Sequence, residues 1–292
     1  MEPKELVILG LQVSIWATVF GFGLSARAGD VTYLFRHTNL LARSIVAMLV
    51  VMPVVAIILA RVFRFEPGVE IAMVALALSP VPPLLPNKET KSGGSGAFAV
   101  GLLAILGLVS IFTVPASLEF LGRLAGSPLT ISRAAIAGVI LKGIVAPLVL
   151  GIAISALVPA LADKLAGPVS KAAKLLLLLA VLPLLIATFP ALLSLATSTT
   201  LLAILLFTAI GLFVGHRMGG PDPDQSVVLA LSTASRHPMI AFSIASANFP
   251  DLQFGGIILL FLLVNALLCV PYLAWQRKHH AVGTIAVGPK HA

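Results

Sequence analysis

The sequence has little charge and a single cysteine. Asp, Glu, Lys and Arg make up 10% of its 292 residues, against about 25% in a typical soluble domain. The one cysteine, Cys269, excludes an internal disulfide and a cysteine-based metal site. Neither paired carboxylates nor a nucleophile with a neighbouring base lies within the apolar stretches. We therefore expect no enzyme, no bound metal and no cofactor.

Apolar residues fill most of the chain. They account for 59% of it, in recurring runs, and a run of about 18 residues or more can cross the ~30 Å hydrocarbon core of a bilayer. We expect an all-α membrane protein forming a single transporter domain over residues 1–292. The runs predict nine membrane helices, at 6–26, 38–62, 68–86, 96–118, 130–158, 168–190, 198–216, 225–248 and 254–275.

Basic residues are unevenly distributed between the predicted loops. Eleven lie on one side of the membrane and five on the other, and basic loops favour the cytoplasm. This predicts an inner-membrane protein with its amino terminus outside and its carboxyl terminus in the cytoplasm. Residues 279–292 are predicted to be a disordered cytoplasmic tail. In such a protein the net charge of +8 indicates anionic lipid as a partner, and not nucleic acid.

Prolines interrupt the predicted helix 68–86. Four of them lie between Pro80 and Pro86, and each removes a backbone donor and clashes with the preceding turn. We expect non-helical backbone at about 80–86. In a membrane such backbone is tolerated only where it is buried in protein or lines a cavity.

A second interruption is predicted at 234–237. There the polar residues "ASRH" separate half a helix from Pro238, and proline can begin a new helix because its missing donor costs nothing there. "ALALSP" (75–80) and "LALSTA" (229–234) are alike and would run in opposite directions. Two broken helices in an inverted repeat are typical of secondary transporters, with a site at mid-membrane. Two unrelated proline kinks are the alternative.

Four segments resemble the bile acid:sodium symporter family. They are "FGFGLS" (20–25), "SPVPPLLPN" (79–87), "LKGIVAPLVLG" (141–151) and "ASANFP" (245–250). Their order and spacing are similar to those of the family from about residue 6 to residue 276. The resemblance implies two broken helices that cross in a core domain, at about 38–118 and 198–275, beside a panel domain at about 6–26 and 130–190. It also implies transport by alternating access, with substrate in the cleft between the domains.

The sodium site of that family is not retained. Sodium-coupled members use an acidic residue and a glutamine in the second broken helix, with further polar ligands elsewhere. The corresponding positions here hold Ser232, Arg236, Val100, Ala104 and Met48. This set lacks the several hard oxygens that sodium requires, so we expect a transporter that is not sodium-coupled.

Arg236 is the leading candidate for binding an anionic substrate. An arginine inside a membrane costs at least ~2.5–3.5 kcal/mol on insertion scales and is a functional hypothesis by default. The alternative is a structural ion pair with Glu89. The remaining candidate substrate-binding residues are short polar groups at the breaks and one histidine, namely Ser79, Asn87, Ser232, Thr233, Ser235 and His237.

Coupling or gating is assigned to Glu89, His237 and Lys142. His237 can gain a proton near neutral pH, although hydrogen bonding or packing is the commoner role. Lys142 lies within a predicted helix, where it either extends to the membrane surface or faces the cleft. The sequence thus predicts a small organic anion as substrate. A cation/proton antiporter that uses Glu89, or a membrane sensor module, remains as an alternative.

Overall fold

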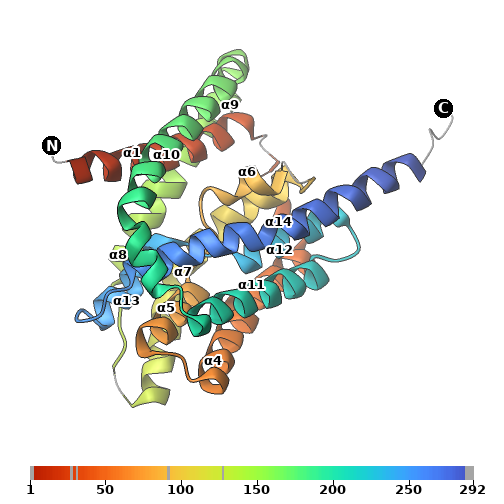
Figure 1. Cartoon of the computed structure of the whole chain (residues 1–292). Coiled ribbons are helices and arrows are strands. Elements are labelled where there is room, and N and C mark those ends of the chain that lie inside the picture. Colours follow the sequence, from red (N-terminus) through yellow and green to blue (C-terminus); the bar gives the residue numbers. More distant parts are fainter. Residues whose placement is uncertain (1–2, 27–28, 31, 91–92, 127, 287–292) are drawn as a thin grey trace.

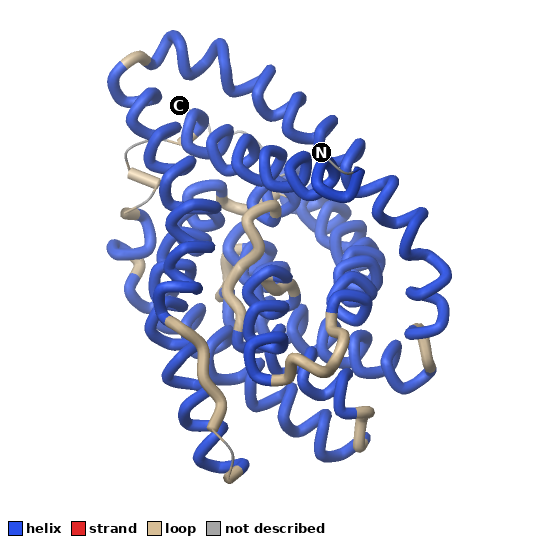
Figure 2. The backbone as a smooth tube through the Cα atoms, turned by 90° about the vertical axis from the view of Figure 1, so that its left-hand side faces the viewer, coloured by secondary structure: helices blue, strands red, loops and turns tan. Residues whose placement is uncertain are grey.

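The computed structural model describes residues 3–26, 29–30, 32–90, 93–126 and 128–286. Over this part of the chain the backbone forms helices and no strand (Figure 2). The first half comprises α1 (Pro3–Ser25), α2 (Tyr33–Arg36), α3 (Thr38–Ile45), the π-helical turn η1 (Val46–Val51), α4 (Met52–Phe63), α5 (Pro67–Leu78), α6 (Leu85–Thr90) and α7 (Gly96–Ala125). The second comprises α8 (Arg133–Ile140), η2 (Leu141–Val145), α9 (Ala146–Leu157), α10 (Pro159–Leu195), α11 (Ser198–Gly219), α12 (Pro223–Ala234), α13 (Pro238–Asn248) and α14 (Gly255–Ala286).

The lengths of these helices confirm an all-α membrane protein. Eight stretches of the described chain are long and apolar enough to cross a bilayer. The remaining predicted helix, 68–86, is divided between the 12-residue α5 and the short α6. The start of α1 and the end of α14 lie at opposite ends of the bundle (Figure 1). The number of crossings, the inverted repeat and the orientation stay predictions.

Two predicted boundaries are wrong. The expected loop before residue 168 is helical, because α10 already begins at Pro159, a residue suited to the first helical position. The expected tail at 279–292 is helical as far as Ala286, since no proline or glycine follows Lys278 until Gly283 to oppose propagation of the helix. Residues 287–292 lie outside the described part.

Both predicted breaks exist, with shifted bounds: residues 85 and 86 are already helical, and residue 234 still belongs to α12. α5 ends at Leu78, and the backbone is non-helical from 79 to 84 before α6 begins. α12 ends at Ala234, residues 235–237 are non-helical, and Pro238 begins α13. Each break follows a 12-residue helix, which is about 18 Å long at 1.5 Å per residue. Breaks at this distance from the start of a helix are expected deep within a span that crosses ~30 Å of hydrocarbon.

Small residues allow close packing on either side of the breaks. Gly211, Gly215 and Gly219 lie on the face of α11 that meets α12, and a Cβ at Gly211 would lie 2.8 Å from the Cα of Ala234. This contact seats the end of α12 directly on α11. Elsewhere Gly23 of α1 faces Gly151 of α9 across a similarly short gap. The predicted division into core and panel domains stays a prediction.

Candidate substrate site at the crossing of two broken helices

A backbone hydrogen bond joins the two breaks. The N–H of His237 donates to the carbonyl oxygen of Pro80 at 2.9 Å. Unwound backbone has lost its helical partners, and an unsatisfied backbone group costs several kcal/mol in a membrane (about the cost of a lost hydrogen bond or more). Each break thus satisfies a group that the other leaves open, and the two broken helices are fixed to each other at this point.

Arg236 lies in this crossing with no solvent exposure. Its Nη1 donates to the carbonyl oxygen of Ser79 in the first break at 3.2 Å, and to that of Met48 in η1 at 3.5 Å. The guanidinium also lies over the ring of Phe207 of α11, with Cζ 5.9 Å from the ring centroid. One nitrogen and one face of the cation are therefore held by protein.

The Met48 carbonyl is available because the chain forms a π-helical turn there. In an α-helix it would accept from the N–H of Met52, but that N–H donates to Ala47 instead. The next residue, Pro53, has no N–H to offer. Proline at this spacing therefore frees a carbonyl for Arg236. The turn η2 has the same construction, with Ala146 donating to Leu141 ahead of Pro147.

The opposite edge of the guanidinium is open. Nε and Nη2 of Arg236 are buried and have no hydrogen-bond partner among the described residues. These two nitrogens direct parallel N–H groups to one side, which is the geometry that receives two oxygens of a carboxylate or related anion. The buried hydroxyl of Thr233 in the last turn of α12 also has no partner within the described chain. The arrangement can bind an anion through two parallel charge-assisted hydrogen bonds.

Glu89 lies on α6, which packs against α12. Its carboxylate has no solvent exposure, and its Oε1 accepts from the Ser232 hydroxyl at 2.6 Å. The hydroxyl of Ser232 on α12 therefore lies against a carboxylate that α6 supplies. Within the described chain, Arg236 donates to carbonyl oxygens and forms no ion pair with Glu89. The ion pair closer than 4.0 Å in this part of the chain is Arg123–Glu119, at 2.6 Å.

Three of the predicted site residues hold the breaks in shape. The Ser79 hydroxyl donates to the carbonyl oxygen of Leu76 at 2.8 Å, so its carbonyl is the part that faces Arg236. Ser235 donates to Oδ1 of Asn265 at 3.1 Å. Nδ1 of His237 accepts from the N–H of Ile240 at 3.4 Å and caps α13. These side chains are committed to backbone or to a neighbouring helix.

Two predicted residues do not join the cluster. Lys142 lies with an exposed side chain on η2, the turn that joins α8 to α9 and packs against α1 and α7. Asn87 lies in α6, and its side chain is outside the described residues.

Sequence reasoning missed two parts of the site, the Met48 carbonyl and Phe207. From the sequence, Met48 was considered only for its side chain, which offers no oxygen to sodium. The spacing from Met48 to Pro53 could have indicated a free carbonyl. Phe207 is one of many aromatic residues in apolar helices and carries no distinguishing pattern.

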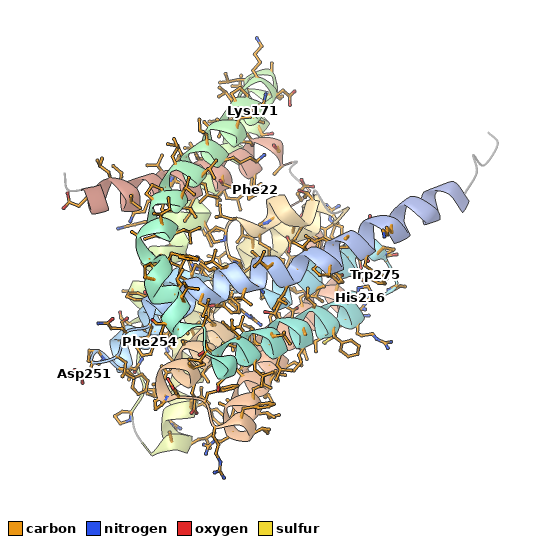
Figure 3. All side chains as sticks on the ribbon, viewed as in Figure 1. Phe22, Lys171, His216, Asp251, Phe254 and Trp275 are labelled. Atoms are coloured by element: carbon orange, nitrogen blue, oxygen red, sulfur yellow. The ribbon has the colours of Figure 1, made fainter. Side chains whose placement is uncertain are left out.

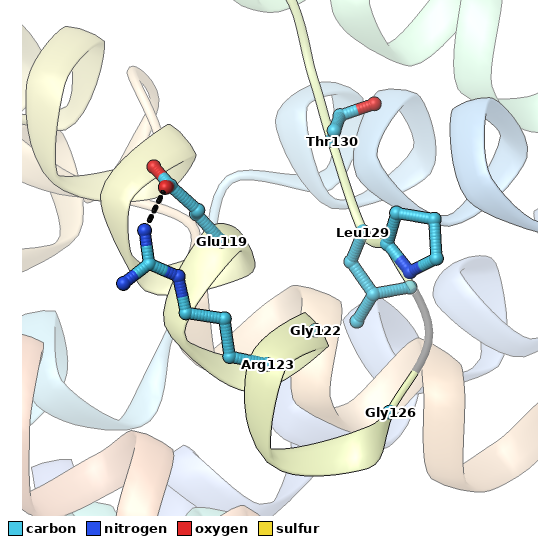
Figure 4. Close-up of a pocket in the computed structure, with 7 residues that line it drawn as sticks. Glu119, Gly122, Arg123, Gly126, Leu129 and Thr130 are labelled. Atoms are coloured by element: carbon cyan, nitrogen blue, oxygen red, sulfur yellow. Dashed lines mark hydrogen bonds and ion pairs between the residues drawn. The ribbon is translucent and has the colours of Figure 1, made fainter.

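Other polar groups lie away from the crossing. His216 of α11 contacts Tyr272 and Trp275 of α14, with Nδ1 3.0 Å from the Tyr272 hydroxyl, at the end of the bundle opposite Asp251 (Figure 3). A pocket of about 310 Å³ lies at the end of α7, lined by residues that include Glu119, Arg123 and Thr130 (Figure 4). Its ion pair is mostly exposed, unlike the fully buried charges at the crossing.

The comparisons with known proteins agree with this architecture. The model of the Sodium Bile acid symporter family matches residues 13–194. The chain belongs to that family. The match covers more than half of the chain and includes the first break, whereas the second break and Arg236 follow it in the sequence. No curated protein sequence matches.

Membership makes the protein a multi-pass membrane transporter with a small-molecule substrate. Members of the family are transporters and not enzymes. The family name refers to sodium and bile acid, so the identity of the substrate and of any coupled ion depends on this chain's own residues.

Proposed function

We propose that the protein carries a small organic anion across the membrane by alternating access, without sodium, and that Arg236 binds the anion. The observation that supports this most is the Nε–Nη2 edge of a fully buried guanidinium. A buried charge that keeps two unused donors is costly. An anionic substrate would supply the two hydrogen-bond acceptors and the negative charge that compensate it.

The surroundings of Arg236 favour an anion over a metal cation. The side chains of Met48, Val100 and Ala104 are buried and offer no oxygen. The N-terminus of α13, which begins directly after Arg236 and His237, adds positive partial charge at the same place. A fixed cation attracts the anion at all times, so no coupling sodium is needed for that purpose.

The Nε–Nη2 edge of Arg236 also favours one kind of anion, with two oxygens on the same group. A carboxylate or a sulfonate presents two oxygens to the parallel N–H groups of Nε and Nη2. Lysine has the same charge but no such fork. An Arg236→Lys protein is therefore expected to bind anion about ten-fold to a hundred-fold more weakly, the loss of one charge-assisted hydrogen bond of ~1.5–3 kcal/mol.

Thermal-shift measurements on the detergent-purified protein test the proposal. We would use taurocholate, benzoate and pyruvate, each in choline medium and in sodium medium. We expect at least one anion to stabilise the wild type equally in both media, Arg236→Lys to respond weakly and Arg236→Gln not at all. Arg123→Gln, which removes an exposed arginine, is the matched control and should respond like the wild type. Stabilisation that requires sodium, or that survives in Arg236→Gln, contradicts the proposal, as does the absence of any response in choline.

A cation/proton antiporter is the second candidate, because Glu89 places a carboxylate in the interior. An antiporter of that kind exchanges cations for protons without an organic anion. Sodium- or potassium-driven proton flux in liposomes that disappears in Glu89→Gln, with no anion bound by the wild type, would favour it over the first proposal.

A further inference from the structure

The guanidinium of Arg236 is held from two directions. Its Nη1 donates to the carbonyl oxygens of Ser79 and Met48 at 3.2 Å and 3.5 Å. Its Cζ lies 5.9 Å from the ring centroid of Phe207 on α11, within the distance at which an aromatic face attracts a cation. Hydrogen bonds to one nitrogen leave a planar group free to tilt about that nitrogen. A ring against its face restrains this tilt.

The ring of Phe207 is itself fixed by a second ring. Phe207 has no solvent exposure and packs edge-to-face against Phe261 of α14, with the ring centroids 6.0 Å apart and an interplanar angle of 70°. Phe261 is also fully buried. Aromatic pairs in this geometry stabilise a protein beyond the area that they bury. Phe207 therefore cannot turn away from Arg236 without losing its contact with α14.

One amide keeps the ring and the cation in register. Nδ2 of Asn265 on α14 donates to the hydroxyl of Thr208 at 3.2 Å, and Thr208 follows Phe207 on α11. The same nitrogen donates to the carbonyl oxygen of Ala234 at 2.9 Å, two residues before Arg236. The helices α11, α12 and α14 pack against one another in all three pairs. The position of the ring relative to the cation is therefore set by three helices and not by the two side chains alone.

We propose that Phe207 is a positioning residue for anion binding: its ring holds the plane of the Arg236 guanidinium, so that Nε and Nη2 meet two oxygens of one anionic group at the same time. This inference rests on the proposed function and names the residue that makes the arginine selective for a carboxylate or a sulfonate. The ring acts through the cation. It fixes the direction of the two N–H groups before the anion arrives, and such preorganisation raises affinity because less has to be ordered on binding.

A role in packing alone makes a different prediction. Phe207 is a large buried apolar side chain, and its truncation would loosen the helices whichever cation stands at position 236. Positioning depends on the planar fork of arginine, which lysine lacks. The two roles are separated by measuring the effect of Phe207 beside arginine and beside lysine.

The first test is a double-mutant cycle. Dissociation constants for taurocholate, benzoate and pyruvate are measured by calorimetry in choline medium for the wild type, Phe207→Leu, Arg236→Lys and the double variant. Beside arginine, loss of the cation–π contact should weaken anion binding by about two-fold to thirty-fold. Beside lysine the same change should weaken it by less than about two-fold. Equal weakening in both backgrounds overturns the inference and leaves anion binding at Arg236 intact.

The second test keeps the ring or its support in turn. Phe207→Tyr retains the ring and should bind anions within about two-fold of the wild type. Phe261→Leu retains the ring and removes its support, so it should weaken binding beside arginine and not beside lysine, even if Phe207→Leu does not fold. The control is Phe213→Leu, which removes a mostly exposed ring of α11 that lies 5.5 Å from Cζ of Arg217 and should bind like the wild type.

Two kinds of failure are distinguishable. Phe207→Leu that binds as tightly as the wild type, or Phe207→Tyr that binds no better than Phe207→Leu, overturns the positioning role alone. Wild-type protein that binds none of the three anions in choline, or Arg236→Gln that binds them like the wild type, defeats the proposed function itself.

Discussion

The N–H of His237 donates to the carbonyl oxygen of Pro80, and this one bond of 2.9 Å connects the two interrupted membrane helices. The residues on either side of it are the candidates for function. Arg236 precedes His237 and reaches the Ser79 carbonyl, which precedes Pro80. A shift of one broken helix against the other would change both contacts together, so the crossing couples the position of the anion-binding cation to the arrangement of the helices.

Asn265 of α14 is expected to hold the second break open. It accepts from Ser235 at 3.1 Å and donates to the Ala234 carbonyl at 2.9 Å and to Thr208 of α11 at 3.2 Å. Asn265→Leu leaves these buried groups without that partner, which should lower the free energy of unfolding by about 2–4 kcal/mol.

Reversible unfolding in mixed micelles measures this effect. The control is Asn39→Leu, which changes an exposed asparagine at the start of α3 and should stay within about 0.5 kcal/mol of the wild type. An Asn265→Leu protein as stable as this control would show that Asn265 does not support the break.

Gly215 is expected to be indispensable for seating α12 on α11. A Cβ at this position would overlap the carbonyl oxygen of Leu229 and lie 2.5 Å from the Cα of Ala230. Both are backbone atoms that cannot rotate away, so Gly215→Ala should cost about 1–3 kcal/mol or more through overpacking.

A second glycine provides the comparison. A Cβ at Gly138 of α8 would have open space around it, with no atom of a described residue within 4 Å. Replacement of Gly138 by alanine should therefore be neutral or raise stability by up to about 1 kcal/mol through helix propensity. Equal melting temperatures for the two alanine variants would refute the close packing of α11 and α12.

The breaks could be predicted from the sequence because proline acts locally. The four prolines from Pro80 to Pro86 are too closely spaced for one continuous helix, and the polar "ASRH" before Pro238 marks the second interruption. The apolar runs likewise predicted the helical membrane protein. Boundaries governed by weak preferences, such as the start of α10 and the end of α14, could not be placed in this way.

The contacts of the site depend on three-dimensional packing and were only partly predictable. Arg236 could be selected because it is an arginine in an apolar region. The hydrogen-bond acceptors of Arg236 could not be predicted, because they are the backbone carbonyl oxygens of Ser79 and Met48, and every residue has such an oxygen. An ion pair between Glu89 and Arg236 was the alternative to substrate binding, because the two have opposite charges, whereas the structure places Ser232 against the carboxylate of Glu89.

The orientation in the membrane rests on the distribution of basic residues and can be tested directly. In a Cys269→Ala background, single cysteines at Pro3 and Ile285 should react with an impermeant maleimide from opposite sides of intact cells. We expect labelling at position 3 from outside, and at position 285 only after the membrane is permeabilised. Labelling of both from the same side would contradict an odd number of crossings.

The contact between Glu89 and Ser232 predicts that a carboxylate can occupy either helix but not both. Ser232→Glu would bring a second carboxylate to the place where Oε1 of Glu89 now lies 2.6 Å from a hydroxyl. Two buried like charges at such a distance cannot both stay ionised, so the single variant should be destabilised by about 3 kcal/mol or more at neutral pH and should recover as one carboxylate is protonated at lower pH.

Exchanging the pair, with Glu89→Ser and Ser232→Glu together, restores one carboxylate beside one hydroxyl. We therefore expect the double variant to unfold nearer to the wild type than Ser232→Glu does, a positive coupling in the double-mutant cycle. The measurement is the melting temperature, across the pH range, of the wild type, the two single variants and the double variant. Glu119→Ser is the exposed control for loss of a carboxylate. Additive effects of the two changes would show that Glu89 and Ser232 do not share one buried site.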